Sequence, residues 1–350
     1  MKIVEITTEV KKIPLKTPFI TALRRVEDVE FVRVTFVCES GAVGIGEAPA
    51  TKAITGEGIE EILHSIEAVK ATLNFHMPSD ALELLHEKRG TDHPICTMGS
   101  SARAALDMAL VSLIAQSQDI PMYRYFGAEE PKPLQTDVTI SLNEPQKMLE
   151  DAKEAYENGI SILKIKVGED ISNSLKATRL ILHALPHARL LIDANQAWNV
   201  ENTMMFISEL KGASIELIEQ PVIAKDLEGL RSITNYSHIP ILADEAVFTL
   251  EDAQKVVETK SADMINIKLM KCGGVTKAVE ILEFCRSHDV KCMLGSMLEG
   301  PYSINIALHL AMAYSDVIEY IDLDSPLLYK EVSDELEFSF NGCEISYKVS

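Results

Sequence analysis

The sequence predicts an α/β fold: a (β/α)8 barrel with an α+β capping domain formed from the N-terminal region and the C-terminal tail. Three observations predict it. Residues 1–128 read as strands followed by helices, eight short apolar runs alternate with amphipathic segments within residues 129–325, and residues 326–350 contain a hairpin signal. A chain of 350 residues is long enough for both units.

The N-terminal region begins with strands. Residues 29–37 are rich in β-branched and aromatic types, and the turn at residues 39–41 leads into a second apolar run that ends at Glu47. Residues 58–73 and 100–117 then place apolar side chains three and four positions apart, which predicts two helices. Strands followed by helices are typical of an α+β unit, and we expect this unit to cap the barrel.

Eight apolar runs follow, separated by helical segments. Strands that alternate with helices predict parallel βαβ units, and eight such units close a barrel. The alternative is an open doubly wound sheet, but no glycine-rich dinucleotide fingerprint follows any run. The runs cover residues 134–142, 162–167, 188–193, 215–219, 239–243, 263–269, 290–295 and 317–323.

The tail predicts a β-hairpin instead of a further barrel unit. Residues 336–340 and 343–347 read as strands, and Asn341-Gly342 between them is a type I′ turn signal. We expect this hairpin to return to the capping domain.

Composition excludes several classes of protein. With 33 Lys and Arg against 53 Asp and Glu, the formal charge of −20 and the absence of a basic run argue against nucleic-acid binding. The six cysteines show no Cys-x-x-Cys motif, which favours reduced thiols. No signal peptide or membrane span is recognisable, so we expect a cytoplasmic protein without a membrane partner.

A polar residue stands at or near the C-terminal end of every apolar run, at intervals of 24 to 28 residues. In a (β/α)8 barrel these strand ends form one face, where active sites lie. The repeat therefore predicts a ring of functional groups around one mouth. Its members are Thr139, Lys166, Asp193, Glu219, Asp244, Lys268, Ser296 and Asp322.

Three of these residues are acids on successive strands. Any one of Asp193, Glu219 and Asp244 alone would more often be a helix N-cap. Together they would repel one another unless a cation joined them. Oxygen ligands without Cys or His favour a hard ion, so we expect Mg²⁺, with Mn²⁺ as a possible substitute.

The lysines indicate acid/base chemistry. Lys164 and Lys166 lie two residues apart on one strand, so both side chains point to the same side, and Lys268 ends the strand opposite. A lone strand lysine is often an edge or snorkelling residue. Two opposed lysines beside a metal could remove and return a proton on two faces of one carbon, through an enediolate that the cation stabilises. Lys164 would lower the pKa of Lys166 by charge repulsion, and the result would be inversion.

With these motifs the sequence resembles the enolase superfamily, in its muconate-lactonizing-type branch, and within that branch the dipeptide epimerases. A lysine base with Mg²⁺ is an established pattern of that superfamily. The resemblance implies a Mg²⁺-dependent isomerase that inverts the C-terminal residue of a dipeptide, L-Ala-D/L-Glu, a peptidoglycan fragment. The motifs are Lys164-Ile165-Lys166-Val167-Gly168, Asp193-Ala194-Asn195-Gln196, Glu219-Gln220-Pro221, Ala243-Asp244-Glu245, Asn266-Ile267-Lys268 and Asp322-Leu323-Asp324.

The resemblance also assigns substrate contacts. Asp322 and Asp324 match the Asp-x-Asp that binds the substrate's α-ammonium, and Arg24 matches an arginine that binds the glutamate side chain, although Arg25 leaves that register open by one residue. Thr139 and Ser296 would line the pocket. Loops at residues 17–25 and 51–57 would close over it, and the unusual second half of the loop 295–301 leaves the preferred N-terminal residue open.

Other functions share parts of this pattern. Cycloisomerases, lyases such as the succinylbenzoate synthases, and N-acylamino acid racemases of the same branch have the same lysines and metal ligands. A catalytically silent barrel that binds a metabolite is a further alternative. The sequence also leaves open whether the chain is a monomer or a homo-oligomer.

Overall fold

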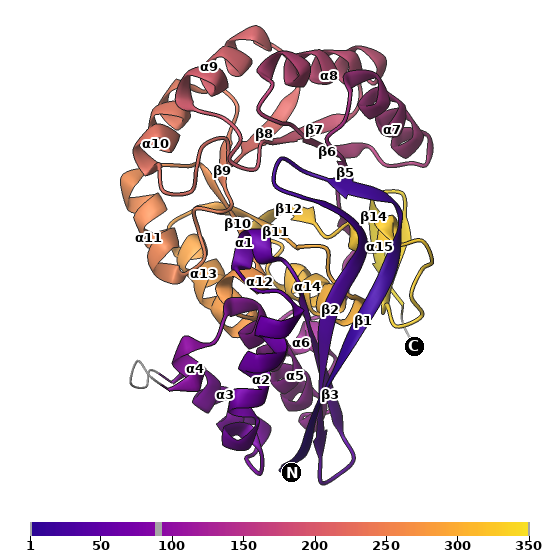
Figure 1. Cartoon of the computed structure of the whole chain (residues 1–350), viewed down its shortest axis with the longest axis vertical. Helices are drawn as coiled ribbons and strands as arrows, with labels where there is room; N and C mark the ends of the chain where they lie inside the picture. Colours follow the sequence, from indigo (N-terminus) through magenta and orange to yellow (C-terminus); the bar gives the residue numbers. More distant parts are fainter. Residues whose placement is uncertain (1, 88–92, 349–350) are drawn as a thin grey trace.

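The computed structural model describes residues 2–87 and 93–348 of the chain. Its N-terminal part is a three-stranded antiparallel sheet in the order β1-β2-β3, covered on one face by helices (Figure 1). The elements are β1 (Ile3–Ile20), β2 (Arg25–Cys38), β3 (Val43–Pro49), α1 (Lys52–Thr55), α2 (Ile59–Leu73), α3 (Pro78–His86), α4 (Pro94–Thr97), α5 (Ser100–Ser117) and α6 (Met122–Tyr125).

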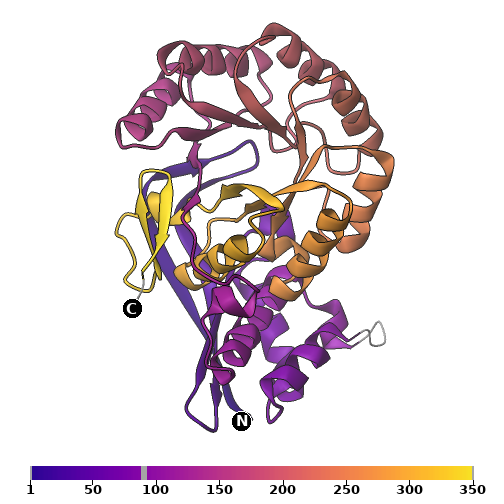
Figure 2. The same ribbon diagram turned by 180° about the vertical axis from the view of Figure 1, so that it is seen from behind.

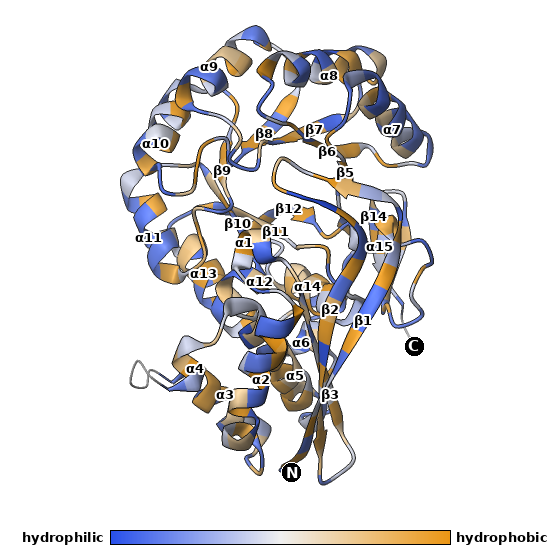
Figure 3. Cartoon of the chain, in the orientation of Figure 1, coloured by the Kyte–Doolittle hydropathy of each residue, from blue (hydrophilic) through white to orange (hydrophobic). Residues whose placement is uncertain are grey.

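The core of this part lies between the sheet and α2 and α5. Helix α5 is hydrophobic along most of its length because it is buried on nearly every side (Figure 3). Strand β3 approaches it closely: a Cβ atom at Gly46 would lie 1.8 Å from the carbonyl oxygen of Ala105. Glycine at this position therefore permits the contact between strand and helix.

The second part is the predicted barrel, and the fold class is confirmed. Eight parallel strands follow one another in chain order, and their helices form the surrounding arc in Figure 1. The strands are β5 (Val138–Ile140), β6 (Ile162–Lys166), β7 (Arg189–Asp193), β8 (Ile215–Glu219), β9 (Ile241–Ala243), β10 (Met264–Lys268), β11 (Lys291–Gly295) and β12 (Ile318–Asp322).

Most of the outer helices bury one face against the strands and show both hydrophobic and hydrophilic residues in Figure 3, as amphipathic helices do, whereas α14 is buried along nearly its whole length. They are α7 (Pro145–Glu157), α8 (Ile171–Ala184), α9 (Val200–Glu209), α10 (Leu227–Tyr236), α11 (Leu250–Thr259), α12 (Leu269–Cys272), α13 (Val275–Ser287), α14 (Pro301–Ala313) and α15 (Ser325–Leu328).

The first and last barrel strands meet at a seam that a regular ladder does not close. The backbone N–H of Asp137 donates to the carbonyl of Ile321 at 3.1 Å, and the Thr136 hydroxyl accepts from the N–H of Leu323 at 3.0 Å. One level up, the N–H of Thr139 donates to a carboxylate, Oδ2 of Asp324, at 2.7 Å. The acidic side chain of Asp324 thus takes part in closing the barrel.

The structure corrects two details of the strand predictions. The run at 134–142 is divided, because β4 (Leu134–Gln135) leaves the barrel and pairs with the C-terminal hairpin, β13 (Phe338–Asn341) and β14 (Glu344–Tyr347). The two-residue loop of that hairpin is Gly342-Cys343, not Asn341-Gly342. In the loop only Gly342 has positive φ, +60°, which favours a type II′ turn over type I′.

The hairpin therefore belongs to a separate sheet, β13-β14-β4, and is not part of the N-terminal sheet. The tail nevertheless reaches the N-terminal part before the hairpin begins, through a bridge between Leu15 and Tyr329. Both views place the yellow C-terminal segment beside the indigo β1 (Figures 1 and 2). The domain boundaries at residues 128 and 325 stay a prediction.

The tip of the β1–β2 hairpin is attached to the barrel mouth. The N–H of Leu142 donates to the carbonyl of Ile20 at 2.9 Å, and the N–H of Ile20 donates to the Ser141 hydroxyl at 3.1 Å. Across the described ranges, no helix is both long and apolar enough to cross a bilayer. Cys38, Cys285, Cys292 and Cys343 are buried free thiols.

Candidate active site

The predicted residues meet at the C-terminal ends of the barrel strands. Strand register places Lys166 beside Asp193 and Asp193 beside Glu219, and on the other side it places Lys268 beside Gly295, which is itself beside Asp322. Asp244 follows directly after β9. The regular spacing in the sequence thus corresponds to one level of the barrel.

A narrow cavity lies at this level, with about 50 Å³ of free volume. That is room for one or two water molecules, so a larger ligand requires the cap or the side chains to move. Lys164, Asp193 and Glu219 are fully buried and do not line the cavity. The lining residues are Thr139, Lys166, Asn195, Asp244, Glu245, Lys268, Ser296, Met297, Leu298, Asp322 and Asp324 from the barrel, and Phe19, Thr21, Leu23, Arg24 and Ile54 from the cap.

Lys164 is a buried cation in contact with three carboxylates. Its Nζ lies 2.6 Å from Oε2 of Glu219, 2.6 Å from Oδ2 of Asp322 and 3.2 Å from Oδ2 of Asp193. Burial alone would lower the pKa of Lys164, but these carboxylates outweigh it and hold the pKa well above its usual range. Lys166 points to the same side, since its Nζ lies 2.5 Å from the same Asp193 oxygen.

A second cluster of charges surrounds Asp244. Lys268 Nζ donates to its Oδ2 at 2.8 Å, and Lys271 Nζ lies 2.6 Å from its Oδ1. Burial would raise the pKa of Asp244, but the two ammonium groups hold it far below its usual range. Burial would lower the pKa of Lys268, but Asp244 and Glu219 raise it. In this arrangement Lys268 carries its proton.

The donor set at the mouth fits a hard divalent cation. Seven buried carboxyl groups face four buried ammonium groups, a formal excess of three negative charges. Glu219 Oε2 and Asp244 Oδ1 are buried and form no hydrogen bond with the described residues, although a lysine lies 2.6 Å from each. The groups are Asp137, Asp193, Glu219, Asp244, Glu245, Asp322 and Asp324, against Lys164, Lys166, Lys268 and Lys271.

The excess charge is visible in the pKa values. Burial and then the neighbouring carboxylates raise the pKa of Glu219 to about 7 and that of Glu245 to about 8. Acids in direct contact with a lysine behave differently: at Asp193, Lys166 and Lys164 overcome burial and lower the pKa to about 2. Oxygen donors in surplus, without Cys or His, are what Mg²⁺ or Mn²⁺ requires.

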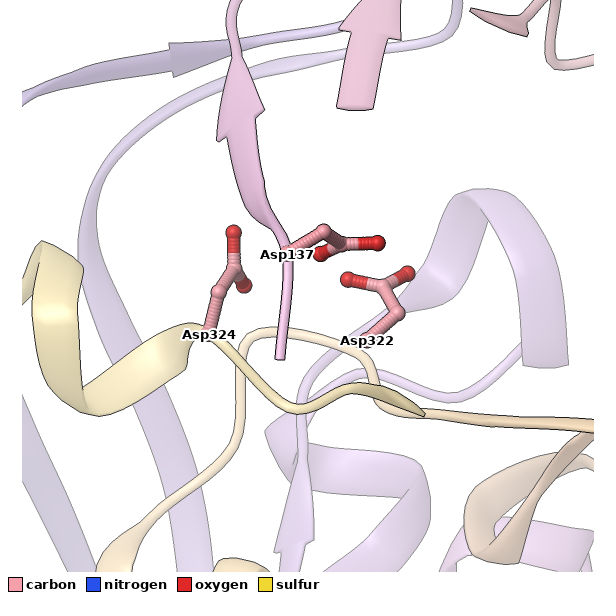
Figure 4. A group of neighbouring side chains, drawn as sticks. All are labelled: Asp137, Asp322 and Asp324. Carbon is pink, nitrogen blue, oxygen red and sulfur yellow. The ribbon is translucent and has the colours of Figure 1, made fainter. Parts of the chain in front are cut away.

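The tightest group of acids lies at the seam and not at the predicted metal ligands. Among the described residues, the one set of three potential ligand groups with oxygens within 4.8 Å of one another is Asp137, Asp322 and Asp324 (Figure 4). Lys164 lowers the pKa of Asp322 in spite of its burial, whereas burial and Asp322 raise that of Asp324 to about 6. Within the described residues, Asp322 forms an ion pair with Lys164, and Asp137 and Asp324 form none.

Arg24 and Arg25 have different environments. Arg24 is half-buried and lines the cavity, and burial lowers its pKa to about 10. No carboxylate of residues 2–87 or 93–348 forms an ion pair with it. Arg25 is exposed and lies 3.2 Å from Glu27. The cavity therefore contains an unpaired guanidinium that suits an anionic ligand.

Several residues of the site were not predicted. Asn266 donates to Glu219 Oε1 at 2.8 Å, and Asp137 joins the acids at the seam. Each lies two positions before a predicted residue on its strand, so the alternation that paired Lys164 with Lys166 could have identified both. Lys271 enters from α12, and no pattern in the sequence indicates it.

The loop after β11 is held firmly beside the cavity. Glu299 Oε1 accepts from the N–H of Met297 at 2.8 Å, and the Ser325 hydroxyl donates to the carbonyl of Met297 at 3.1 Å. Glu47 from β3 accepts from the N–H groups of Tyr302 and Ser303 at the start of α14. The N-terminal part thus fixes a loop that lines the site.

Comparison with known proteins yields two family models. "Mandelate racemase / muconate lactonizing enzyme, N-terminal domain" matches residues 3–127, and "Enolase C-terminal domain-like" matches residues 147–345. The L-amino acid-D/L-Glu epimerase of Sulfurimonas denitrificans is 60% identical over 99% of both chains. The L-Ala-D/L-Glu epimerase of Bacillus subtilis is 39% identical over 99% of this chain and 94% of that protein.

Solved structures agree with this relationship. The substrate-liganded L-Ala-D/L-Glu epimerase from Bacillus subtilis superposes with a TM-score of 0.93 at 38% identity, over 99% of this chain and 96% of that chain. The dipeptide epimerase from Enterococcus faecalis, complexed with Mg and L-Leu-L-Tyr, gives a TM-score of 0.90 at 32% identity, over 99% and 97% of the two chains. The resemblance inferred from the motifs is confirmed.

Proposed function

This chain belongs to the mandelate racemase/muconate lactonizing enzyme family of the enolase superfamily, and we propose that it is a Mg²⁺-dependent epimerase of dipeptides that end in glutamate. The relatives named as L-Ala-D/L-Glu and L-amino acid-D/L-Glu epimerases support the reaction and the glutamate. The complex of the Enterococcus faecalis protein with Mg supports the metal. Mn²⁺ is a possible substitute, because it accepts the same oxygen ligands.

One observation carries the proposal: the charges lining the cavity complement a zwitterionic dipeptide with an acidic side chain. The unpaired guanidinium of Arg24 suits the side-chain carboxylate. Asp322 and Asp324 suit the α-ammonium. Asp193, Glu219 and Asp244 would hold the Mg²⁺, which when bound supplies positive charge for the α-carboxylate and makes the neighbouring C–H more acidic.

Lys166 and Lys268 are the two acid/base groups in this proposal. They end the second and sixth of eight strands and line the same cavity. One takes the α-proton from one face of the glutamate α-carbon and the other donates a proton to the opposite face, so the carbon is inverted. Lys164 does not line the cavity and instead holds Asp193, Glu219 and Asp322 in place.

The remaining substrate contacts follow from position. Thr139 and Ser296 line the cavity beside the seam acids and would face the dipeptide backbone. Met297 and Leu298 add an apolar wall, and the rigid loop that carries them would contact the N-terminal residue. The relative named for L-amino acid-Glu dipeptides supports tolerance at that residue.

Asp322 and Asp324 also separate this proposal from its alternatives. An N-acylamino acid racemase or a cycloisomerase of the same branch has no substrate ammonium to place against these two buried carboxyls. Asp322 would then share Lys164 with Glu219 and Asp193, and Asp324 would form no ion pair with the described residues. A silent metabolite-binding barrel would have no use for two opposed lysines in one cavity.

The test is proton exchange in D₂O with L-Ala-L-Glu. We expect deuterium at the glutamate α-carbon and formation of the L-Ala-D-Glu epimer with Mg²⁺, and neither with EDTA. N-acetyl-L-Ala-L-Glu is the matched control and should exchange far more slowly. Absence of deuterium from Ala-Glu in the presence of Mg²⁺ would refute the proposal, and faster exchange of the N-acetyl compound would favour the racemase.

A further inference from the structure

Asp137 is a buried acid to which the proposed reaction assigns no role. It stands immediately before β5, and its side chain is 1% exposed. Within the described part of the chain, no N–H or hydroxyl group donates to either carboxylate oxygen, and the hydrogen-bonding neighbour of the carboxyl is another acid, Asp322. One of them lies within 4.8 Å of oxygens of both Asp322 and Asp324, and Figure 4 shows the carboxyl groups of Asp137 and Asp322 turned toward each other.

Closure of the barrel seam does not explain why a carboxyl is buried at position 137. The backbone N–H of Asp137 bonds to Ile321, and the hydroxyl of Thr136 bonds to the backbone of Ile321 and Leu323. These contacts close the seam without the carboxyl of Asp137. A buried carboxyl whose polar neighbour is a second carboxyl destabilises a fold unless a proton or a cation joins the two.

Charge around Asp137 points to a missing cation. Burial and then repulsion from Asp322 raise its pKa well above the usual range. Lys164 is the ammonium beside this group, and it already contacts Asp322, Glu219 and Asp193. Three carboxyls at the seam therefore share a fraction of one positive charge. A bound ammonium group would supply the second.

We propose that Asp137 is a specificity-determining residue. Together with Asp322 and Asp324 it forms a group of three carboxyls that selects the primary α-ammonium of a dipeptide over an acylated nitrogen. Asp137 does not line the cavity and acts through Asp322 and Asp324, which do. The proposal rests on the function proposed above and extends it to a residue two positions before Thr139, one level deeper in the barrel.

The experiment compares Asp137→Asn with the wild type. The KM for L-Ala-L-Glu should rise at least about tenfold, which corresponds to about 1.4 kcal/mol, because the amide, unlike a carboxyl, cannot ionise when the ammonium binds. The inhibition constant of N-acetyl-L-Ala-L-Glu, whose nitrogen is neutral, should change less than about twofold. The ratio of the two constants measures selection for the ammonium and is insensitive to a general loss of active-site order.

Thr136→Val is the matched control. It removes the seam hydrogen bonds beside Asp137 without changing charge, so it should lower the Tm and leave the ratio unchanged. An unchanged KM in Asp137→Asn, or an equal rise in both constants, would overturn the proposal. If Asp137→Asn does not fold, Asp137→Ser is measured in its place, and failure of both to fold would show that Asp137 serves the fold.

Failure of the proposed reaction is distinguishable from failure of this inference. A wild-type enzyme that exchanges no proton in Ala-Glu refutes the reaction. Calorimetric binding of Ala-Glu and of its N-acetyl derivative to wild type and Asp137→Asn then still reports selection for the ammonium. Equal selection by both proteins contradicts the role of Asp137 whatever the reaction.

Discussion

Lys164 on β6 and Asp322 at the end of β12 are joined by a contact of 2.6 Å between Nζ and Oδ2. The same ammonium lies 2.6 Å from Glu219. One side chain therefore links the carboxylates assigned to the metal with those assigned to the substrate ammonium. Its position, fully buried among acids, makes it the residue on which the charge balance of the site depends.

Replacing this lysine should destabilise the protein strongly. Lys164→Met leaves buried carboxylates without their cation, and we expect the free energy of unfolding to fall by about 3–5 kcal/mol. Lys147→Met, which removes an exposed ion pair with Asp151, should cost less than about 1 kcal/mol. Urea unfolding measures both. Equal stability of Lys164→Met and wild type without Mg²⁺ would contradict the assigned role.

Variants of the two cavity lysines, Lys166 and Lys268, should differ in the epimer of Ala-Glu whose α-proton they still exchange. Lys166→Ala and Lys268→Ala should each lower the epimerisation rate by about 10² to 10⁴, the usual contribution of an acid/base group. Each variant should retain α-proton exchange with one epimer of Ala-Glu, and the two should retain opposite epimers. Exchange in D₂O followed by NMR measures this. Loss of exchange with both epimers, together with equal loss of Mg²⁺ binding, would speak against separate roles.

The adjacent arginines offer a matched pair of variants. Arg24→Met should raise the KM for L-Ala-L-Glu about 10- to 150-fold, the value of a charge-assisted hydrogen bond of about 1.5–3 kcal/mol. Arg25→Met should leave the KM unchanged, because Arg25 is exposed and paired with Glu27. Initial rates with L-Ala-L-Glu decide the assignment. A larger effect at Arg25 would show that Arg25, and not Arg24, binds the glutamate side chain.

The pH dependence of stability should reveal the excess of acids. Burial and neighbouring carboxylates raise the pKa values of Glu219, Glu245 and Asp324 to about 7, 8 and 6. The folded, Mg²⁺-free protein then holds protons that the unfolded chain releases above about pH 4. Its free energy of unfolding should therefore fall between about pH 5 and pH 8, by up to about 1.4 kcal/mol per pH unit for each group.

Residues with lowered pKa values do not change the free energy of unfolding between about pH 5 and pH 8. Asp193, Asp244 and Asp322 contribute stability that is present at neutral pH and is lost only as the pH falls below the ordinary carboxyl range. Saturating Mg²⁺ should flatten the decline, since a cation allows the acids to ionise in the folded state. Urea titrations with EDTA or Mg²⁺ measure the difference, and a rise in stability toward pH 8 with EDTA would be the contrary result.

The sequence by itself determined the barrel, its eight strands and the level of the active site. Strand periodicity brought Lys164 to the side of Lys166, and the near-constant interval between strand ends placed Asp193, Glu219 and Asp244 on neighbouring strands. These relations are local or repeat along the chain, because a parallel strand and its crossover helix have a nearly fixed length.

Only the tertiary structure decided the rest. It divided the run 134–142 between two sheets, placed Arg24 in the cavity and Arg25 outside it, and brought Lys271 from α12 to Asp244. It also gathered Asp137 with Asp322 across the seam, 185 positions apart along the chain. Contacts of this kind depend on how the barrel closes and how the cap docks. Strand alternation could have indicated that Asp137 faces the same side as Thr139, but not that it meets Asp322.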